Sequence, residues 1–231
     1  AMHFAPTAAS MNNLLREGVE PSDCLVTGNT GIDALLQTAA HRLPAPEMFP
    51  NLPRVILATA HRRESFGAPI ESALEGIRAA ADRYDDVGVF FLTHPNPRAH
   101  EPARRILGGH PRIVVSGALG YADLVAALKR CWIVVTDSGG LQEEAPALGK
   151  PVLVLRNTTE RPEAVRAGAV RVVGTNSTSV ANAISQLHDD PDLYARMSVP
   201  VFPYGDGQAS KRIVAAMRAR LERPIPALYA A

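Results

Sequence analysis

The stretch WIVVTDSGGLQEEAPALGKPVLVL, residues 132–155, decides the fold of this chain. An apolar run ends at Asp137 and is followed by a Ser-Gly-Gly turn, a helix-length segment from Leu141 to Leu148, and a second apolar run from Val152 to Leu155. This order of segments is typical of a βαβ unit, in which a helix connects two parallel strands. Residues 132–155 therefore predict a buried parallel sheet.

The same alternation extends in both directions from this stretch, from Arg54 to about residue 187. Short apolar runs suit strands that are buried on both faces, and the amphipathic segments between them have the length of helices. We expect an α/β fold with a doubly wound parallel sheet, whose ligand crevice lies at the carboxyl ends of the strands. The predicted strands are Val55–Thr59, Val87–Thr93, Ile113–Val115, Trp132–Thr136, Val152–Leu155 and Val170–Val173, and the predicted helices are Pro69–Tyr84, Pro97–Leu107, Tyr121–Lys129, Leu141–Leu148, Pro162–Ala167 and Ser179–Leu187.

The segments outside this region are less regular. Thr7 is a suitable N-cap for a helix from Ala8 to Glu17, and Leu25–Thr27 is a short strand candidate. Residues 42–53 contain four prolines and little periodicity, which is typical of a linker. Residues 209–221 predict a final amphipathic helix, which we expect to pack on the core or to reach back to another domain. Its apolar face comprises Ile213, Val214, Met217 and Leu221.

Composition excludes several classes of protein. With 46% hydrophobic and 20% charged residues among 231, the chain is not largely disordered. Its net charge of +1 is too small for the broad basic field that binds nucleic acid or acidic membranes. We see no apolar run near the ~20 residues of a membrane span and no signal peptide at the start, so we expect a cytoplasmic protein. Cys24 and Cys131 indicate neither a disulfide framework nor a zinc site, and we expect no metal or cofactor.

The turn Ser138-Gly139-Gly140 is a candidate site for an anion. It joins a buried strand to a helix start, where free backbone N–H groups and the helix dipole favour negative charge. The glycines allow close approach of a diphosphate, and Ser138 offers a further hydroxyl. Glu143 and Glu144 follow, and either could accept hydrogen bonds from a ribose. The alternative is that the turn is only tight and that the acids only complement the helix dipole.

Three further polar motifs follow predicted strands. TAHRRE at residues 59–64 contains His61, Arg62 and Glu64, which suit phosphate oxygens or form a solvated ion-pair patch. THPNP at residues 93–97 brings His94, which points into the same crevice if the strands are neighbours, or else satisfies loop carbonyls. RNTTERPE at residues 156–163 adds two arginines, with Thr159 or Glu160 as N-cap of the next helix.

All four motifs should open on one side of one sheet, because each follows a strand. Independent turns have no reason to coincide in this way. The residues therefore predict a site for a phosphorylated, nucleotide-linked ligand, although the chain lacks a P-loop and a GxGxxG fingerprint.

Taken together, the motifs VTGNT (26–30), TAHRRESFG (59–67), HPNP (94–97), TDSGGLQEEAP (136–146), TERPE (159–163) and YGDG (204–207) resemble the bacterial, non-hydrolysing UDP-N-acetylglucosamine 2-epimerase family. The resemblance covers nearly the whole chain. It implies two Rossmann-like domains in a GT-B-type architecture, with the substrate in the cleft between them. On this basis residues 1–41 are a remnant of the N-terminal domain, 42–53 the linker, 54–205 the C-terminal UDP-binding domain, and 206–231 a C-terminal helix and tail.

The family interconverts UDP-GlcNAc and UDP-ManNAc by eliminating UDP across C1 and C2 and adding it back. The resemblance implies that His61 assists the departure and return of UDP. Ser138, Gly139 and Gly140 would hold the diphosphate, Glu144 the ribose, and the backbone near Leu124 the uracil. Arg62, Glu64 and His94 resemble a second, regulatory UDP-GlcNAc site, and Thr159, Glu160 and Arg161 would border the sugar cleft.

In the family, the N-terminal domain supplies the carboxylates that move the C2 proton. We therefore expect the chain alone to bind UDP weakly and to turn over slowly or not at all, because abstraction of a weakly acidic C–H proton needs a positioned base. The resemblance also suggests a homodimer for the full-length enzyme. The alternatives are a stand-alone UDP-sugar binding module and a fragment of a GT-B glycosyltransferase.

Overall fold

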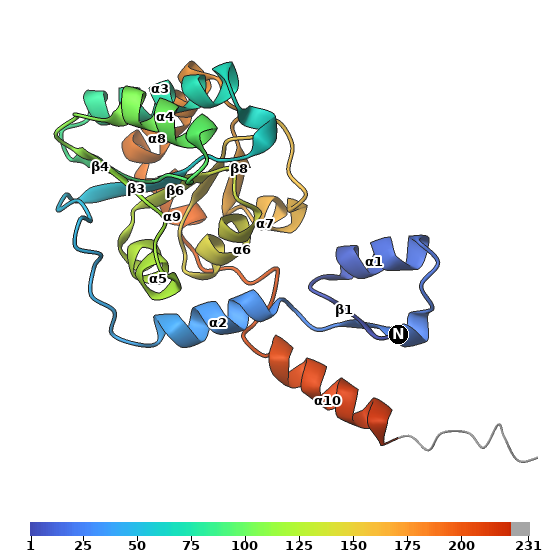
Figure 1. Ribbon diagram of the computed structural model, residues 1–231. Helices are drawn as coiled ribbons and strands as arrows, with labels where there is room; N and C mark the ends of the chain where they lie inside the picture. The colour runs from blue at the N-terminus through green and yellow to red at the C-terminus, as the bar shows by residue number, and fades with distance from the viewer. Residues whose placement is uncertain (223–231) are drawn as a thin grey trace, which may run out of the picture. The chain divides into compact units, whose positions relative to one another are not determined.

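The computed structural model describes residues 1–222, which form two compact units (Figure 1). The smaller unit comprises Ala1–Gln37 and the chain from Tyr204 onward, and the larger unit comprises Thr38–Pro203. Residues 223–231 of the predicted tail lie outside the described residues. Within residues 1–222, no helix combines the length and apolar character needed to cross a bilayer.

The larger unit is built on a six-stranded parallel sheet with the order β5-β4-β3-β6-β7-β8. The chain enters at a central strand, proceeds to one edge, and returns to the centre to fill the other half. The order therefore reverses between β3 and β6, where Thr59 is in register with Thr136. Such a switch point opens a crevice at the carboxyl ends of the strands. The strands are β3 (Arg54–Thr59), β4 (Val87–Leu92), β5 (Ile113–Ser116), β6 (Ile133–Thr136), β7 (Val152–Val154) and β8 (Val170–Val172).

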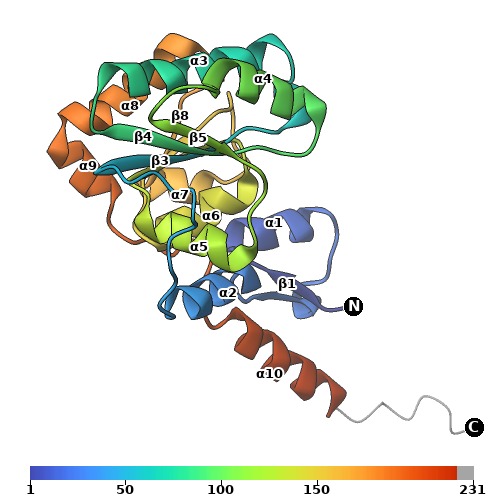
Figure 2. The ribbon, with the colours of Figure 1, turned by 60° about the vertical axis from the view of Figure 1, so that its left-hand side comes forward.

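Helices cover both faces of this sheet. α3, α4 and α8 lie on one face, and α5 and α6 lie on the other (Figures 1 and 2). The helices of this unit are α3 (Ala68–Arg83), α4 (Pro97–Leu107), α5 (Tyr121–Arg130), α6 (Gly139–Ala147), α7 (Pro162–Arg166), α8 (Ser177–Asp189) and α9 (Pro191–Met197), with a short 3-10 turn, η2 (Arg63–Ser65), before α3. Helices on both faces explain why the central strands are apolar throughout.

The core lies between the sheet and α3, α4 and α8. In α3 the buried positions Ile70, Ala73, Leu74 and Ile77 follow helical spacing, so that one stripe faces the sheet. Every residue of β4 is buried, in accord with a strand covered by helices on both sides. Each fully buried large apolar side chain stabilises the unit by roughly 1.5–3 kcal/mol. The core therefore holds the strand ends in fixed positions.

Within its described residues, the smaller unit contains a two-stranded parallel sheet and three α-helices. β1 (His3–Ala5) pairs with β2 (Cys24–Val26), and α1 (Ala8–Arg16), η1 (Pro21–Asp23), α2 (Thr30–Ala39) and α10 (Ala209–Leu221) complete it. The buried Asp33 carboxylate accepts the N–H groups of Ala209 (3.0 Å) and Ser210 (2.7 Å). Burial opposes its ionisation, but these hydrogen bonds prevail and lower the pKa of Asp33. Asp33 thus caps α10 from another helix.

Most of the predicted elements are confirmed. The six strands and six helices predicted in the larger unit all form within two residues of their predicted ends, and Thr7 caps α1 by accepting from the N–H of Ser10. The predicted fold class, a Rossmann-like doubly wound parallel α/β sheet, is confirmed as well. β1, α2 and α9 were not predicted.

For the final helix, the second of the two expected arrangements is the one observed. α10 belongs to the same compact unit as residues 1–37, and its first residues donate to Asp33. Its apolar face is largely uncovered, because Val214 and Met217 are about half exposed and Leu221 is 82% exposed. Residues 42–53 form neither helix nor strand, and Phe49 packs edge-on against Phe90 of β4 with ring centroids 5.3 Å apart.

Candidate functional site

A cavity of about 260 Å³ opens at the switch point between β3 and β6. It gathers residues from four separate loops, each of which follows a strand of the sheet. Of the predicted site residues, His61, His94, Leu124, Ser138, Gly140 and Glu144 line it. The other lining residues are Thr59, Leu92, Thr93, Pro95, Ala118, Leu119 and Leu141. Three of the four predicted motifs therefore meet at this cavity, as expected. The fourth, at residues 156–163, does not line it and joins the same edge of the sheet through ion pairs to Arg62 and Glu64.

The wall of the cavity nearest β6 is the start of α6. Ser138 is the N-cap residue, and its own N–H donates to Thr136 Oγ1 at 2.9 Å. The Ser138 side chain makes no capping hydrogen bond to the helix, which leaves its hydroxyl available to a ligand. A Cβ placed on Gly139 would lie 3.5 Å from Arg62 Nη2 and 3.9 Å from Arg161 Nη2. Two guanidinium groups thus reinforce the positive end of the helix dipole.

The loop that carries His61 is attached to β6 through Asp137. Asp137 Oδ2 accepts the backbone N–H groups of His61 at 2.6 Å and Arg62 at 2.7 Å. The second oxygen, Oδ1, lies 3.3 Å from Nδ1 of the His61 imidazole. Asp137 therefore determines the path of the loop between β3 and η2.

The side chains of His61 and His94 are in contact. The rings of His61 and His94 stack with centroids 5.6 Å apart and an interplanar angle of 15°. Neighbouring strands β3 and β4 deliver them, as the sequence predicts if the strands are adjacent. The two histidines also line a second cavity of about 450 Å³, together with Arg62 and Glu64 among others.

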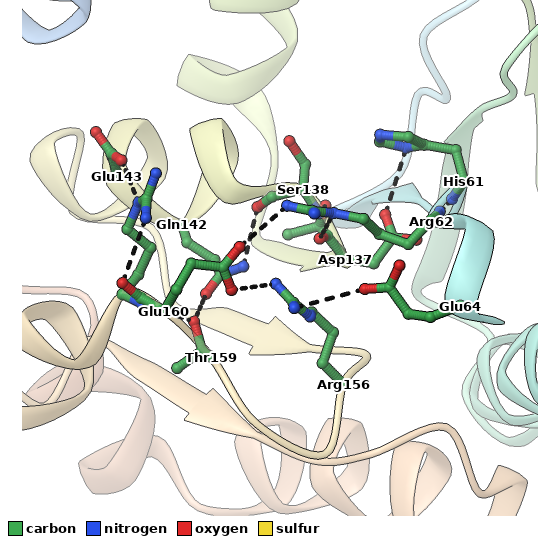
Figure 3. A network of polar contacts seen from close by, with 12 residues as sticks. His61, Arg62, Glu64, Asp137, Ser138, Gln142, Glu143, Arg156, Thr159 and Glu160 are labelled. Carbon is green, nitrogen blue, oxygen red and sulfur yellow. Dashed lines mark hydrogen bonds and ion pairs between the residues drawn. The ribbon is translucent and has the colours of Figure 1, made fainter.

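An ion-pair network links the loops after β3 and β7 (Figure 3). Glu160 pairs with Arg62 (3.4 Å) and with Arg156, which in turn contacts Glu64 at 3.5 Å. Burial opposes ionisation of Glu160, but its hydrogen bonds and the two arginines outweigh burial and lower its pKa. The ion-pair interpretation of the TAHRRE motif is thus correct for Arg62 and Glu64, and it does not exclude a ligand role.

The adjacent acids of α6 have different environments. Glu143 is buried and pairs with Arg161, whereas Glu144 lines the cavity and accepts from the Tyr121 hydroxyl at 3.4 Å. Burial raises the pKa of Glu144, and the charge of Glu143 adds to the rise, although the Tyr121 hydrogen bond opposes it. Burial and the nearby Glu144 likewise raise the pKa of Tyr121 to about 12.

The loop after β7 contacts α6 through a fully buried amide. Gln142 donates through Nε2 to Ser138 O at 3.1 Å and accepts at Oε1 from the Thr159 hydroxyl. Arg161, not Thr159 or Glu160, is the N-cap residue of α7, so that expectation is wrong. Thr159 is engaged elsewhere, because its hydroxyl also accepts the N–H of Arg161. Thr159, Glu160 and Arg161 line neither of the two cavities described above.

Sequence reasoning did not assign a role to Asp137, Gln142 or Tyr121. Asp137 carried a usable signal, because a carboxylate directly after an apolar strand must find buried partners. Gln142 and Tyr121 carried none, since their contacts depend on how loops distant in sequence pack. Among residues 1–222, no group of three or more His, Cys, Asp or Glu side chains is placed to hold a metal ion.

The comparisons with known proteins agree with this geometry. Residues 1–218 match the protein family described as UDP-N-acetylglucosamine 2-epimerase. The chain belongs to this family.

The relatives of the epimerase family are longer than the chain. A UDP-N-acetylglucosamine 2-epimerase of Escherichia coli K12 is 43% identical over 226 residues, which cover 94% of the chain and 60% of the relative. An S. aureus MnaA structure solved with UDP has a TM-score of 0.89 at 43% identity and covers 96% of this chain and 62% of its own. A Neisseria meningitidis UDP-GlcNAc 2-epimerase bound to UDP-GlcNAc has a TM-score of 0.87 at 38% identity, with 94% and 61% covered.

Proposed function

We propose that the chain is the UDP-binding part of an isomerase that interconverts UDP-GlcNAc and UDP-ManNAc. The observation that carries this proposal is the start of α6, which opens into the cavity beside His61. Family membership and the UDP and UDP-GlcNAc complexes of similar structures support it. The chain spans about 60% of the curated relative's length.

In this proposal Ser138, Gly139 and Gly140 bind the diphosphate. Charge-assisted hydrogen bonds from backbone N–H groups at a helix start suit phosphate oxygens, and the absence of side chains at the glycines allows close approach. The Ser138 hydroxyl adds a donor that α6 does not use. The terminal nitrogens of Arg62 and Arg161 supply positive charge near Gly139.

The nucleoside extends from the diphosphate into the apolar part of the cavity. Glu144 is the carboxylate that lines this part, and a carboxylate is a suitable acceptor for ribose hydroxyls. Leu124 lies on the same wall, where the backbone at the start of α5 can read the edge of uracil. This assigns Glu144 rather than Glu143 to the ribose, since Glu143 is engaged with Arg161.

His61 assists the bond-breaking step. Elimination removes the C2 proton and breaks the bond between C1 and the diphosphate oxygen, which yields a glucal and UDP, and re-addition reverses both changes on either face of the sugar. An imidazole beside the departing diphosphate can supply and withdraw a proton near neutral pH. None of the residues assigned here acts as the base that removes the C2 proton.

Two further assignments complete the proposal. Arg62, Glu64 and His94 form a second, regulatory UDP-GlcNAc site, for which the 450 Å³ cavity has the room and the charge. Thr159, Glu160 and Arg161 border the sugar cleft, where their ion pairs with α6 and the loop after β3 hold them near the diphosphate end. The complete enzyme acts as a homodimer.

Calorimetric titration of the chain with UDP tests the nucleotide assignment. Replacing Ser138→Ala removes one hydrogen bond to a charged group, so we expect UDP to bind roughly 5- to 30-fold more weakly. Ser198→Ala is the matched control. The Ser198 hydroxyl donates to Ala195 O, outside the residues assigned to the nucleotide, so its removal should leave UDP affinity unchanged. Equal affinity for wild type and Ser138→Ala would contradict the assignment.

The reaction is tested on the complete gene product with UDP-GlcNAc. Formation of UDP-ManNAc supports the epimerase, whereas transfer of the sugar to an acceptor would indicate a glycosyltransferase. Tight UDP binding without either reaction would indicate a sensor of UDP-sugars. The arrangement of Ser138, His61 and Glu144 around one cavity favours the first outcome.

A further inference from the structure

Asp137 is a buried charged side chain at the switch point to which the proposed function gives no task. It is 1% exposed and lies directly after β6, in the position next to the diphosphate turn. Its Oδ2 accepts two backbone N–H groups, those of His61 and Arg62, at 2.6 and 2.7 Å. Two short bonds to consecutive amides hold the loop after β3 in one conformation.

The other oxygen of the same carboxylate lacks a hydrogen-bond partner. Asp137 Oδ1 is fully buried, and among the described residues none satisfies it. The imidazole Nδ1 of His61 lies 3.3 Å from Oδ1, a close contact that does not meet hydrogen-bond geometry, and the Thr59 hydroxyl lies 3.3 Å from the same nitrogen, where it can accept or donate. An unsatisfied buried carboxylate oxygen is costly. A proton on Nδ1 places positive charge beside Oδ1 and lowers this cost, and the same N–H can donate to Thr59, whereas a lone pair on Nδ1 would face the carboxylate.

We propose that Asp137 is a positioning residue for His61, which holds the neutral imidazole with its proton on Nδ1 and so leaves Nε2 to exchange a proton with the ligand. The proposal rests on the proposed function for the role of His61, but the tautomer itself does not. The hydrogen bonds from the backbone N–H groups to Oδ2 determine the position of the imidazole ring. Oδ1 determines which ring nitrogen carries the proton. One carboxylate thereby joins the ends of β3 and β6 and orients the proton-transferring group.

His94 provides an internal reference for this tautomer. Its Nδ1 accepts the N–H of Asn96 at 3.0 Å, so a neutral His94 carries its proton on Nε2. The two stacked rings are therefore expected to hold opposite tautomers. A spectroscopic method that separates them tests both assignments in one sample.

An amide at position 137 should reverse the tautomer of His61. In Asp137→Asn, the single carbonyl oxygen is needed by the N–H groups of His61 and Arg62, so the NH₂ group turns toward the imidazole. A donor in that position requires a lone pair on Nδ1 and moves the proton to Nε2. The change in volume is small, and the charge is the main difference.

The experiment is a long-range proton–nitrogen correlation spectrum of the ¹⁵N-labelled chain at pH about 9, where unperturbed histidines are neutral. Wild type should show His61 as the Nδ1–H form and His94 as the Nε2–H form. Asp137→Asn should invert His61 alone. The control Asp82→Asn removes a carboxylate paired with His110 at 3.0 Å and should leave His61 as in wild type.

Two results would overturn the proposal. One is an Nε2–H form of His61 in wild type, which decides the question even if Asp137→Asn does not fold. The other is a folded Asp137→Asn chain in which His61 keeps its proton on Nδ1.

Kinetics of the complete enzyme give a second readout. Asp137→Asn should lower kcat about 100-fold or more with a smaller change in KM, because Nε2 then carries the proton of the neutral imidazole and can no longer take one up from the ligand. UDP added to the wild-type chain separates this inference from the proposed function. If UDP leaves the His61 signals unmoved while the tautomers are as stated, the nucleotide assignment fails and the positioning role stands. If UDP binds at His61 but the tautomer is unaffected by Asp137→Asn, the positioning role fails alone.

Discussion

At the scale of single residues, the most informative pair is Glu143 and Glu144. They are neighbours of identical chemistry, but a helix turns about 100° per residue, so they face different surroundings. Glu143 is buried against Arg161, while Glu144 lines the cavity beside Tyr121. Sequence could indicate that acids are present near the helix start, but not which of them a ligand reaches, because that depends on the rotation of α6.

Glu144→Gln should change how UDP affinity depends on pH. The folded pKa of Glu144 is raised from 4.5 by burial, so its carboxylate is lost at a higher pH than usual as acid is added. We expect the variant to bind UDP about 10-fold more weakly at pH about 7.5, and the difference to vanish as the pH falls toward about 4.5. Titration of the UDP phosphate affects both proteins and cancels in the ratio of their dissociation constants.

The melting temperature serves as the control for this variant. Burial disfavours ionised Glu144, so replacing it with a neutral side chain should leave stability equal or higher at pH about 7.5. A ratio of dissociation constants that stays constant between the two pH values would show that Glu144 does not bind the ribose as a carboxylate.

At the scale of elements, apolar runs of three to seven residues predicted the strands well. Strands covered on both faces leave little other choice of residue. Two of the elements that were not predicted have weak signals, since β1 has three residues and α9 has seven. The third, α2, carried a usable signal, because the buried Ile32 and Leu35 are three residues apart in a ten-residue helix. α10 was predicted with two alternatives for its surroundings, because an amphipathic pattern indicates a face that can be buried and does not name what covers it.

Gly139→Ala should separate ligand binding from stability at the start of α6. The added Cβ meets only Arg62 Nη2 at 3.5 Å and Arg161 Nη2 at 3.9 Å, both flexible ends in ordinary contact. Alanine is also the better helix former by about 1 kcal/mol. We expect an unchanged or higher melting temperature but UDP affinity reduced 10-fold or more, because the methyl group occupies the space that the diphosphate needs.

Calorimetry and thermal melting of the same samples measure both effects. Gly117→Ala is the matched control, since a Cβ there meets nothing within 4 Å and the residue lies after β5, outside the start of α6 that is assigned to the diphosphate. Wild-type affinity in Gly139→Ala would place the diphosphate elsewhere.

At the scale of the whole molecule, all the assigned site residues lie in the larger unit, between residues 61 and 161. Their meeting could be predicted because parallel strands end at one edge of a sheet. The hydrogen-bond and ion-pair network that orients these residues could not be predicted. Contacts such as that of Gln142 with Thr159 arise from loops whose paths the sequence does not define.

The division of the reaction between this chain and the rest of the protein gives the last prediction. Among the described residues that line the main cavity, Glu144 is the only carboxylate, and it is assigned to the ribose. Asp137 contacts the His61 loop and is not exposed to the cavity. A base for the C2 proton must lie within hydrogen-bond reach of it.

We therefore expect the chain alone to bind UDP-GlcNAc without exchanging its C2 proton. In D₂O, NMR of the sugar should show no deuterium at C2 after prolonged incubation with the chain, whereas the complete gene product should incorporate it during epimerisation. The wild-type chain with UDP in place of UDP-GlcNAc provides the binding control. Deuterium incorporation by the chain alone would mean that a residue of this cavity acts as the base. His61 would then be the first residue to replace. Apart from Glu144, His61 and His94 are the side chains lining the cavity that can accept a proton.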